Sequence, residues 1–251
     1  METKLYLDIL PQPNNTTCGP TCLHAIYRYF GDPLPLDRVV SEIPRIEGGG
    51  TLSVFLAGHA LRRGYRATIF TYNLQLFDPT WANATRDEIA RKLRLQAACK
   101  KSVSGLEVAT QGYLEFLELG GQLRFEVLTA GLIRRYLKRS LPVLSGLSST
   151  YLYNSAREYG EGADLLFDDV RGESTGHFVV LAGYDKQDRT VLIADPLMPN
   201  PLAPGQYYHV SISRLVCSIM LGTLTFDGDL LIIEPATWRR GRPSPPAGGA
   251  N

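Results

Sequence analysis

The feature that most constrains the fold is a pair of apolar segments at residues 178–184 and 190–194, separated by the polar run 185–189. Two short apolar runs on either side of a polar turn are typical of a β-hairpin. A hairpin brings the start of its first strand beside the end of its second strand. This part of the chain is therefore predicted to form an antiparallel sheet in which His177, just before the first strand, lies near Asp195, just after the second.

The first half of the chain is predicted to be mainly helical. Residues 18–30 form an amphipathic pattern with Pro20 in its first turn, where the missing N–H of proline is tolerated. Within residues 77–120, Thr85 and Glu88 have the spacing of a capping box at the start of a helix. A second helical pattern follows, so we expect a helical insertion there. Helices first and antiparallel strands later indicate an α+β fold.

We expect residues 1–236 to form one domain. A disordered tail that is rich in Arg, Pro and Gly is expected at 237–251. Residues 148–176 are predicted to form a long loop with some order. The other expected elements are helices at 37–43, at 51–63 with Thr51 or Ser53 as the cap, and after a cap at Thr129, and strands at 66–71, 123–128, 142–147, 207–210 and 229–233.

Composition and charge argue against several classes of function. The net charge is +1, so no overall field favours nucleic acid as a partner. No apolar run approaches the ~18 residues that a membrane helix needs, and the first ten residues lack the features of a signal peptide. We therefore expect a cytoplasmic protein with no membrane segment. The four cysteines are too sparse in a chain of this length for a disulfide framework, and they form no CxxC pair, which argues against a zinc site.

Cys18 is the strongest candidate for a nucleophile. It follows the polar turn 14–17 and begins a predicted helix, where the positive end of the helix dipole favours a thiolate. Gly19 leaves the sulfur uncrowded. Gln12, six residues earlier, is a candidate oxyanion-hole donor beside the Cys18 backbone N–H. A buried structural cysteine and a surface glutamine are the alternatives for these two residues when each is taken alone.

His177 is the best candidate for a general base among the four histidines. The predicted hairpin allows the Asp195 carboxylate to accept its ring N–H, to fix the tautomer and to stabilise the imidazolium. The other three histidines, His24, His59 and His209, are expected to be structural. Nucleophile, base, orienting acid and oxyanion donor thus occur in an order that one fold can assemble.

These residues resemble the papain-like cysteine peptidase superfamily, and within it they are most similar to the bacteriocin-processing (double-glycine leader) peptidase family and its free-standing relatives. The matching motifs are Gln12, Cys18-Gly19-Pro20-Thr21-Cys22, Gly176-His177-Phe178-Val179-Val180 and Ala194-Asp195-Pro196. The resemblance implies a papain-like fold, with the nucleophile helix packed on a twisted antiparallel sheet. It also implies hydrolysis of a peptide or amide bond through a Cys18 thioester, without a cofactor. One departure is Thr17, which stands where those peptidases commonly have an aspartate.

Two alternatives to a peptidase stay open. The same thioester could be transferred to an amine, as in a peptidyl or glutamyl transferase, or the fold could bind peptides without turnover. A peptide or protein is the expected partner in each case, and the helical insertion is a candidate site for a partner protein. A further hypothesis is that the acidic loop before His177, including Asp168 and Asp169, selects a basic or aromatic peptide segment.

Overall fold

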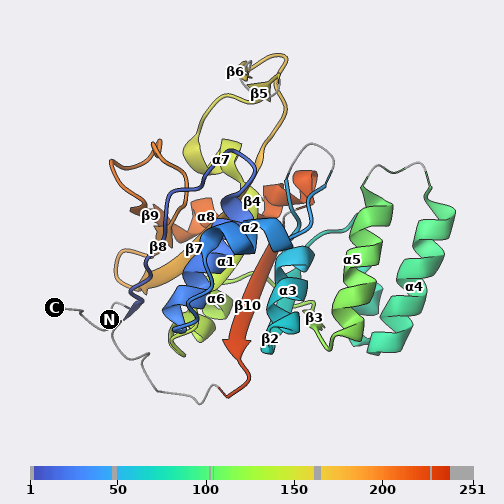
Figure 1. The fold of residues 1–251 in the computed structure, drawn as a ribbon. Helices are drawn as coiled ribbons and strands as arrows, with labels where there is room; N and C mark the ends of the chain where they lie inside the picture. Colours follow the sequence, from blue (N-terminus) through green and yellow to red (C-terminus); the bar gives the residue numbers. More distant parts are fainter. Residues whose placement is uncertain are drawn as a thin grey trace.

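One large sheet organises the computed structural model, which describes residues 3–46, 50–101, 103, 105–160, 165–226 and 228–237 (Figure 1). Its strands are β1 (Thr3–Lys4), β2 (Tyr65–Thr71), β3 (Gln122–Arg124), β4 (Val143–Ser148), β7 (Gly176–Asp185), β8 (Thr190–Ala194), β9 (Tyr207–Ser211) and β10 (Asp229–Pro235). They are ordered β3-β2-β10-β4-β7-β8-β9, and β1 pairs with β7. The pairs are antiparallel except β2 with β3, which is parallel.

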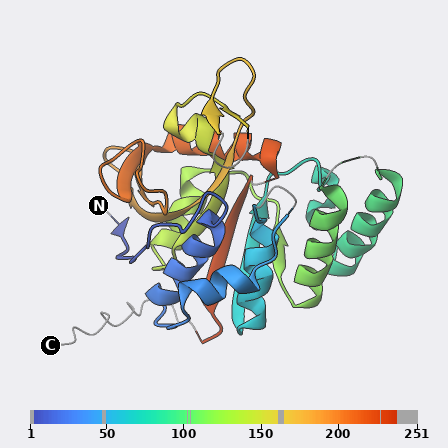
Figure 2. The same cartoon turned by 45° about the horizontal axis from the view of Figure 1, so that its top comes forward.

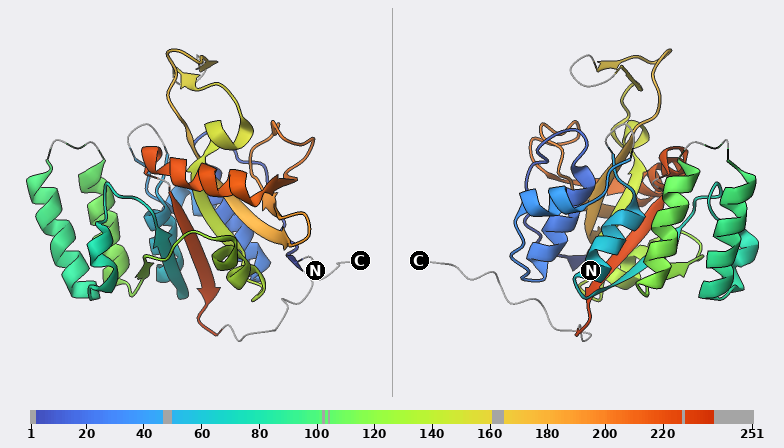
Figure 3. Two further views of the ribbon diagram at one scale, coloured as in Figure 1. Left: turned by 180° about the vertical axis from the view of Figure 1, so that it is seen from behind. Right: turned by 45° about the vertical axis from the view of Figure 1, so that its right-hand side comes forward.

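Helices cover both faces of this sheet. The first group is α1 (Cys18–Tyr29), α2 (Leu36–Glu42) and α3 (Ser53–Arg62), and the second is α6 (Ala130–Leu137) and α8 (Ile212–Leu221). On one face, α1 packs against β7 and α3 against β2, while α8 packs on β4 from the other face (Figure 3). Because both faces are covered, every residue of β4 is buried. The predicted α+β papain-like fold is confirmed.

The two helices of the predicted insertion, α4 (Arg86–Cys99) and α5 (Leu106–Glu118), lie at one side of the molecule (Figure 1). A short 3-10 helix, η1 (Pro79–Asn83), precedes them. The capping box forms as predicted, since Thr85 accepts from the Glu88 backbone N–H and Glu88 accepts from the Thr85 backbone N–H. Only α5 of the two packs against α3, so α4 is the outer helix. Within the described residues, no helix is long and apolar enough to cross a membrane.

The sequence prediction was wrong at three places in the sheet and its helices. Neither Thr51 nor Ser53 caps α3. The residue before the helix is Leu52, whose side chain makes no capping hydrogen bond, and the Thr51 hydroxyl donates to the Pro44 carbonyl. The strand expected at 123–128 is only the three-residue β3, since it lies at the edge of the sheet and pairs with β2 alone. Helix α8 was not predicted, although Ser211 caps it by accepting from the Arg214 backbone N–H.

The predicted loop at 148–176 contains regular structure. Helix α7 (Ser149–Tyr153) follows β4 directly, and the strands β5 (Glu158–Tyr159) and β6 (Leu166–Phe167) pair as a small separate hairpin. This hairpin stands away from the body of the molecule (Figures 1 and 2). At the other end of the chain, the predicted disordered tail lies, apart from Thr237, outside the described residues.

A buried carboxyl begins β10. Asp229 is 1% exposed and pairs in the sheet with Thr71 of β2 on one side and Gly146 of β4 on the other. Burial raises the pKa of this carboxyl to about 7, and the hydroxyls of Ser53, Thr71 and Tyr113 that face it oppose the shift without cancelling it. The protonated form of Asp229 is therefore favoured by the fold.

The pKa of Asp229 predicts how stability changes with pH. Between about 3.9, the pKa of an unfolded aspartate, and the folded value, the native protein keeps a proton that the unfolded chain has released. The free energy of unfolding of the wild type, minus that of Asp229→Asn, should therefore fall as pH rises, by up to about 1.4 kcal/mol per pH unit, and level off above the folded pKa. Urea denaturation of both proteins from pH 4 to 8 measures this difference. A difference independent of pH would contradict the prediction.

Candidate active site

The candidate nucleophile stands where α1 meets the sheet. Cys18 is the first residue of α1, and it is partly exposed, whereas Cys22 one turn later is buried. Gly19 makes the close approach possible, because a Cβ at this position would lie 2.7 Å from Thr51 Cγ2 and 3.1 Å from Phe178 Cδ2. A side chain here would push the start of α1 away from β7. The glycine therefore fixes how near Cys18 comes to the strand that carries His177.

The turn before Cys18 is held by its own side chains. The Thr17 hydroxyl donates to the Asn14 carbonyl at 3.0 Å, and it accepts from the Asn14 backbone N–H at 3.2 Å. The Asn14 side-chain oxygen accepts from the Thr16 backbone N–H at 3.0 Å. Thr17 is fully buried, so its hydroxyl orders the backbone that leads into α1. This gives a structural reason for threonine at the position where the bacteriocin-processing peptidases commonly have an aspartate.

The structure brings His177 and Asp195 together. The Nε2 atom of His177 lies 2.9 Å from Oδ1 of Asp195, and the two side chains are 7% and 0% exposed. Cys18 lies close enough to His177 for the two side chains to shift each other's pKa. Because Nε2 faces the carboxylate, Nδ1 is the ring nitrogen that remains for the sulfur. The fold therefore groups three side chains from two distant parts of the chain, with His177 between the Asp195 carboxylate and the Cys18 sulfur.

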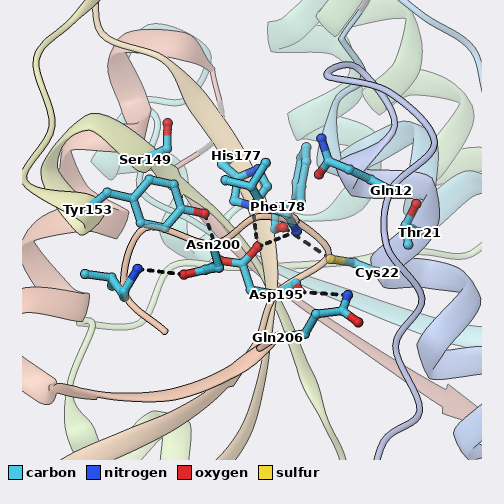
Figure 4. Close-up of polar contacts among 12 residues, drawn as sticks. Gln12, Thr21, Cys22, Ser149, Tyr153, His177, Phe178, Asp195, Asn200 and Gln206 are labelled. Carbon is cyan, nitrogen blue, oxygen red and sulfur yellow. Dashed lines mark hydrogen bonds and ion pairs between the residues drawn. The ribbon is translucent and has the colours of Figure 1, made fainter. Parts of the chain in front are cut away.

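Asp195 is surrounded by donors, as Figure 4 shows for Tyr153 and His177. Its Oδ2 accepts from the Tyr153 hydroxyl at 2.8 Å and from the Tyr208 hydroxyl at 2.5 Å, while Oδ1 also accepts from the Leu197 backbone N–H at 2.9 Å. Sequence reasoning did not predict that either tyrosine contacts Asp195. Tyr153 ends α7 and Tyr208 lies in β9, so no local pattern links either of them to the carboxylate.

The electrostatics of the site favour a charged pair. Burial raises the pKa of the Cys18 thiol, but the neighbouring His177 with its positive charge, together with the backbone groups of Phe178 and Gly19, outweighs burial and leaves the pKa below its usual value. Burial lowers the pKa of His177, but Asp195 and Cys18 together raise it well above its usual range. Burial likewise opposes ionisation of Asp195, yet His177 and Tyr208 keep the pKa of its carboxyl low. The arrangement thus stabilises a thiolate beside an imidazolium.

Gln12 and Cys22 lie at the edge of this site (Figure 4). The Gln12 backbone N–H donates to the Pro196 carbonyl at 2.8 Å, which holds this segment beside Asp195. The Gln12 side-chain nitrogen donates to the Asn14 carbonyl at 2.9 Å, and its oxygen is buried without a hydrogen-bond partner among the described residues. The Cys22 thiol donates to the Phe178 carbonyl at 3.2 Å, so it ties α1 to β7.

The other three histidines lie away from this group. His24 is buried inside α1, and His209 is on β9, where Nδ1 lies 3.3 Å from the Thr190 hydroxyl. His59 joins three helices, because its Nδ1 is 2.8 Å from the Tyr27 hydroxyl and its Nε2 is 3.0 Å from Glu42. These contacts give His59 the structural role that was expected.

One carboxylate of the acidic loop, that of Asp168, is bound within the loop itself. Asp168 follows β6, and its Oδ1 accepts from the backbone N–H groups of Val170 and Arg171. Its Oδ2 forms an ion pair of 2.6 Å with Arg171. The carboxylate therefore holds its own turn together, and its charge is already compensated. A basic substrate segment would have to displace Arg171 to reach it.

Comparison with known proteins gives one family. A sequence model of the Peptidase_C39 like family matches residues 4–211, a span that contains Gln12, Cys18, His177 and Asp195. No curated protein matches the chain. The matched span begins at β1 and ends with β9, so it includes every strand of the sheet except β10, together with the two helices of the predicted insertion.

The donors on Asp195 lead to a prediction about stability. Tyr208→Phe removes a hydrogen bond to a buried carboxylate, which should lower the free energy of unfolding by about 2–3 kcal/mol at pH 7. The neighbouring Tyr207→Phe is the matched control, because the Tyr207 hydroxyl donates 2.7 Å to the neutral Leu7 carbonyl. It should lose only about 1 kcal/mol. Denaturant unfolding measures both, and equal losses would mean that Asp195 does not depend on Tyr208.

Proposed function

The chain belongs to the Peptidase_C39-like family, and on that premise we propose that it is a cysteine peptidase that hydrolyses a peptide or amide bond through a thioester on Cys18. The family itself supports a cysteine-peptidase type of function in general. The observation that carries the finer proposal is the grouping of Cys18, His177 and Asp195 at the N-terminus of α1, in which His177 is hydrogen-bonded to Asp195 and lowers the pKa of Cys18. Thiol acyl transfer requires a nucleophile, a base and an orienting carboxylate in this order.

In this proposal the two halves of the reaction use the same residues. The Cys18 thiolate attacks the substrate carbonyl carbon, and the His177 imidazolium gives its Nδ1 proton to the leaving amine as the tetrahedral intermediate collapses to a thioester. Water then gives a proton to His177 and attacks the thioester, which releases the acid product and restores Cys18. Asp195 stays ionised throughout, keeps Nε2–H in place and stabilises the imidazolium.

Two donors support the oxyanion of each tetrahedral intermediate in this mechanism. The first is the backbone N–H of Cys18, at the positive end of the α1 dipole. The second is the side-chain amide of Gln12, which has two N–H groups and gives one of them to the Asn14 carbonyl. Its other N–H is then available to the substrate oxygen.

The organisation of the chain follows from the same proposal. We infer that residues 1–236 act as one catalytic domain in which residues 77–120 are an insertion, with a peptide or protein as substrate. The outer helix α4 is the candidate site for a partner protein, because α5 lies between it and α3.

The reactivity of Cys18 with iodoacetamide against pH tests the thiolate–imidazolium pair. Because His177 lowers the pKa of Cys18 against the effect of burial, alkylation should persist well below pH 8.5, about the pKa of a free thiol. In His177→Ala the two effects of His177 are lost and burial, the largest effect, is opposed only by the backbone groups of Phe178 and Gly19, so the rate below pH 8.5 should fall by more than tenfold. Peptide mass spectrometry reads the rate at Cys18, and the exposed Cys99 and Cys217 provide an internal reference in each digest.

Three outcomes of these measurements have different meanings. If Cys18 reacts no faster than Cys99 in both proteins, the enzyme proposal fails and a binding domain is favoured. If Cys18 is activated, a peptide library is digested with the wild type and with Cys18→Ser, and cleavage by the wild type alone supports the peptidase. If glycinamide is added as an amine acceptor and the products carry it, the reaction is transfer and not hydrolysis.

The proposed role of Gln12 predicts a loss in turnover alone. Removing one oxyanion donor typically costs about 2.7–4 kcal/mol of transition-state stabilisation, so Gln12→Ala should lower kcat by about 100–1000-fold with little change in KM. The rate of Cys18 alkylation should change little, because iodoacetamide passes through no oxyanion. If alkylation and kcat fall together, Gln12 supports the structure of the site and does not act as an oxyanion donor.

A further inference from the structure

Hydrogen bonds fix the backbone of Asp195 on both sides. Its N–H donates to the Gln206 carbonyl at 2.8 Å, and the Gln206 side chain donates to the Asp195 carbonyl at 3.1 Å (Figure 4). The carbonyl of the next residue, Pro196, accepts from the Gln12 backbone N–H at 2.8 Å. Because the main chain is held, rotation of the carboxylate is the freedom that remains for this residue.

Four donors occupy the two oxygens of this carboxylate. Oδ1 lies 2.9 Å from Nε2 of His177 and accepts from the Leu197 backbone N–H, also at 2.9 Å. Oδ2 accepts from the hydroxyls of Tyr153 at 2.8 Å and Tyr208 at 2.5 Å. An ionised carboxylate has about four lone-pair sites, so these contacts saturate it, and a proton on either oxygen would face a group that donates. The four contacts therefore favour the ionised form and oppose rotation.

The Tyr153 side chain contacts both members of the pair formed by His177 and Asp195 (Figure 4). Its hydroxyl donates to the carboxylate, and its ring centroid lies 6.0 Å from that of His177, with the rings tilted by 54°. Tyr153 ends α7, and the start of this helix is bonded to the segment just before β7, since the backbone N–H and the hydroxyl of Ser149 donate to the Thr175 carbonyl at 2.9 and 3.0 Å. Helix α7 thus ties the start of β7 to the carboxylate.

Tyr208 reaches the same oxygen from a different element. It lies on β9, which pairs with β8, the strand that Asp195 follows. Burial and the adjacent carboxylate raise the pKa of both the Tyr153 and the Tyr208 hydroxyl. Both hydroxyls therefore keep the protons that they donate, and Oδ2 is held from two sides.

The ionisable groups that face Asp195 in the described part of the chain come from four elements. His177 lies on β7, Tyr153 on α7 and Tyr208 on β9. On α1, burial and nearby negative charge raise the pKa of the Cys22 thiol, which stays neutral. Within this set His177 is the group that can carry a positive charge, so the imidazolium depends on the carboxylate staying ionised.

We propose that Tyr153 and Tyr208 are positioning residues for the Cys18 reaction, because their hydroxyls hold Asp195 ionised and hold its Oδ1 on Nε2 of His177. The inference rests on the proposed function, since it concerns how the thiolate–imidazolium pair is maintained. Without the two hydroxyls, Oδ2 of Asp195 is buried without a donor, which favours uptake of a proton. A protonated Asp195 no longer balances the imidazolium, so the pKa of His177 falls. Cys18 then loses the positive charge that lowers the pKa of its thiol.

The test is the rate of Cys18 alkylation by iodoacetamide at pH 5 divided by the rate at pH 9, which measures how much thiolate survives in acid. The variant Tyr153→Phe/Tyr208→Phe keeps both rings and removes both hydroxyls, and it should lower this ratio at least about tenfold, with about threefold for each single variant. The matched control is Tyr151→Phe, on the same helix and 43% exposed, which should leave the ratio unchanged. A purely structural role changes both rates together and does not move the ratio.

Proton NMR gives a second readout of the same contact. The hydrogen-bonded Nε2–H of His177 resonates far downfield of the backbone amides, and its absence in His177→Ala assigns it. As the pH is lowered, this resonance should disappear at a higher pH in the double variant than in the wild type. Loss at the same pH in both proteins would contradict the positioning role.

The other cysteines separate the possible outcomes. The buried Cys22 should stay unmodified in every variant that is folded, and if the double variant unfolds, the single variants carry the test. A ratio equal to that of the wild type in folded variants overturns the positioning role and leaves the proposed function intact, as does an equal fall in Tyr151→Phe. If the ratio for Cys18 in the wild type is no higher than that for the exposed Cys99, the proposed function fails, and this inference fails with it.

Discussion

The buried carboxylate of Asp195 is the constraint on which the rest of the site depends. A fully buried charge is tolerated only where hydrogen bonds and a counter-charge replace water. Asp195 obtains these from the His177 ring, the hydroxyls of Tyr153 and Tyr208, and the Leu197 backbone N–H. Because these donors come from β7, α7, β9 and the segment after β8, satisfying one carboxylate fixes four separate parts of the chain relative to one another.

A second set of contacts brings α1 to this centre. Gly19 allows the helix to lie against Phe178, and the Cys22 thiol donates to the Phe178 carbonyl one turn later. The Thr17 hydroxyl orders the turn before the helix. These contacts are packing and hydrogen bonds away from the sulfur itself, and they decide how near Cys18 lies to His177. The geometry of the proposed nucleophile is therefore set by its neighbours in the fold.

The features that the sequence predicted well are those encoded by a few adjacent residues. The hairpin of β7 and β8 follows from two apolar runs around a polar turn, and the capping box at Thr85 follows from spacing alone. Helix α8 was missed although Ser211 caps it, because its apolar residues follow a strand without a clear break. The edge strand β3 was predicted too long, since strand length at an edge depends on how much of the neighbouring strand is available.

The sequence by itself determined the fold class, the helix that begins at Cys18, and the approach of His177 to Asp195, because each is fixed by short-range periodicity, capping or a hairpin turn. Only the tertiary structure decided which side chains complete the surroundings of Asp195. Tyr208 reaches the carboxylate because β9 pairs with β8, and Tyr153 reaches it from α7, which directly follows β4. Such contacts join residues that are distant in the chain, and no local pattern encodes them.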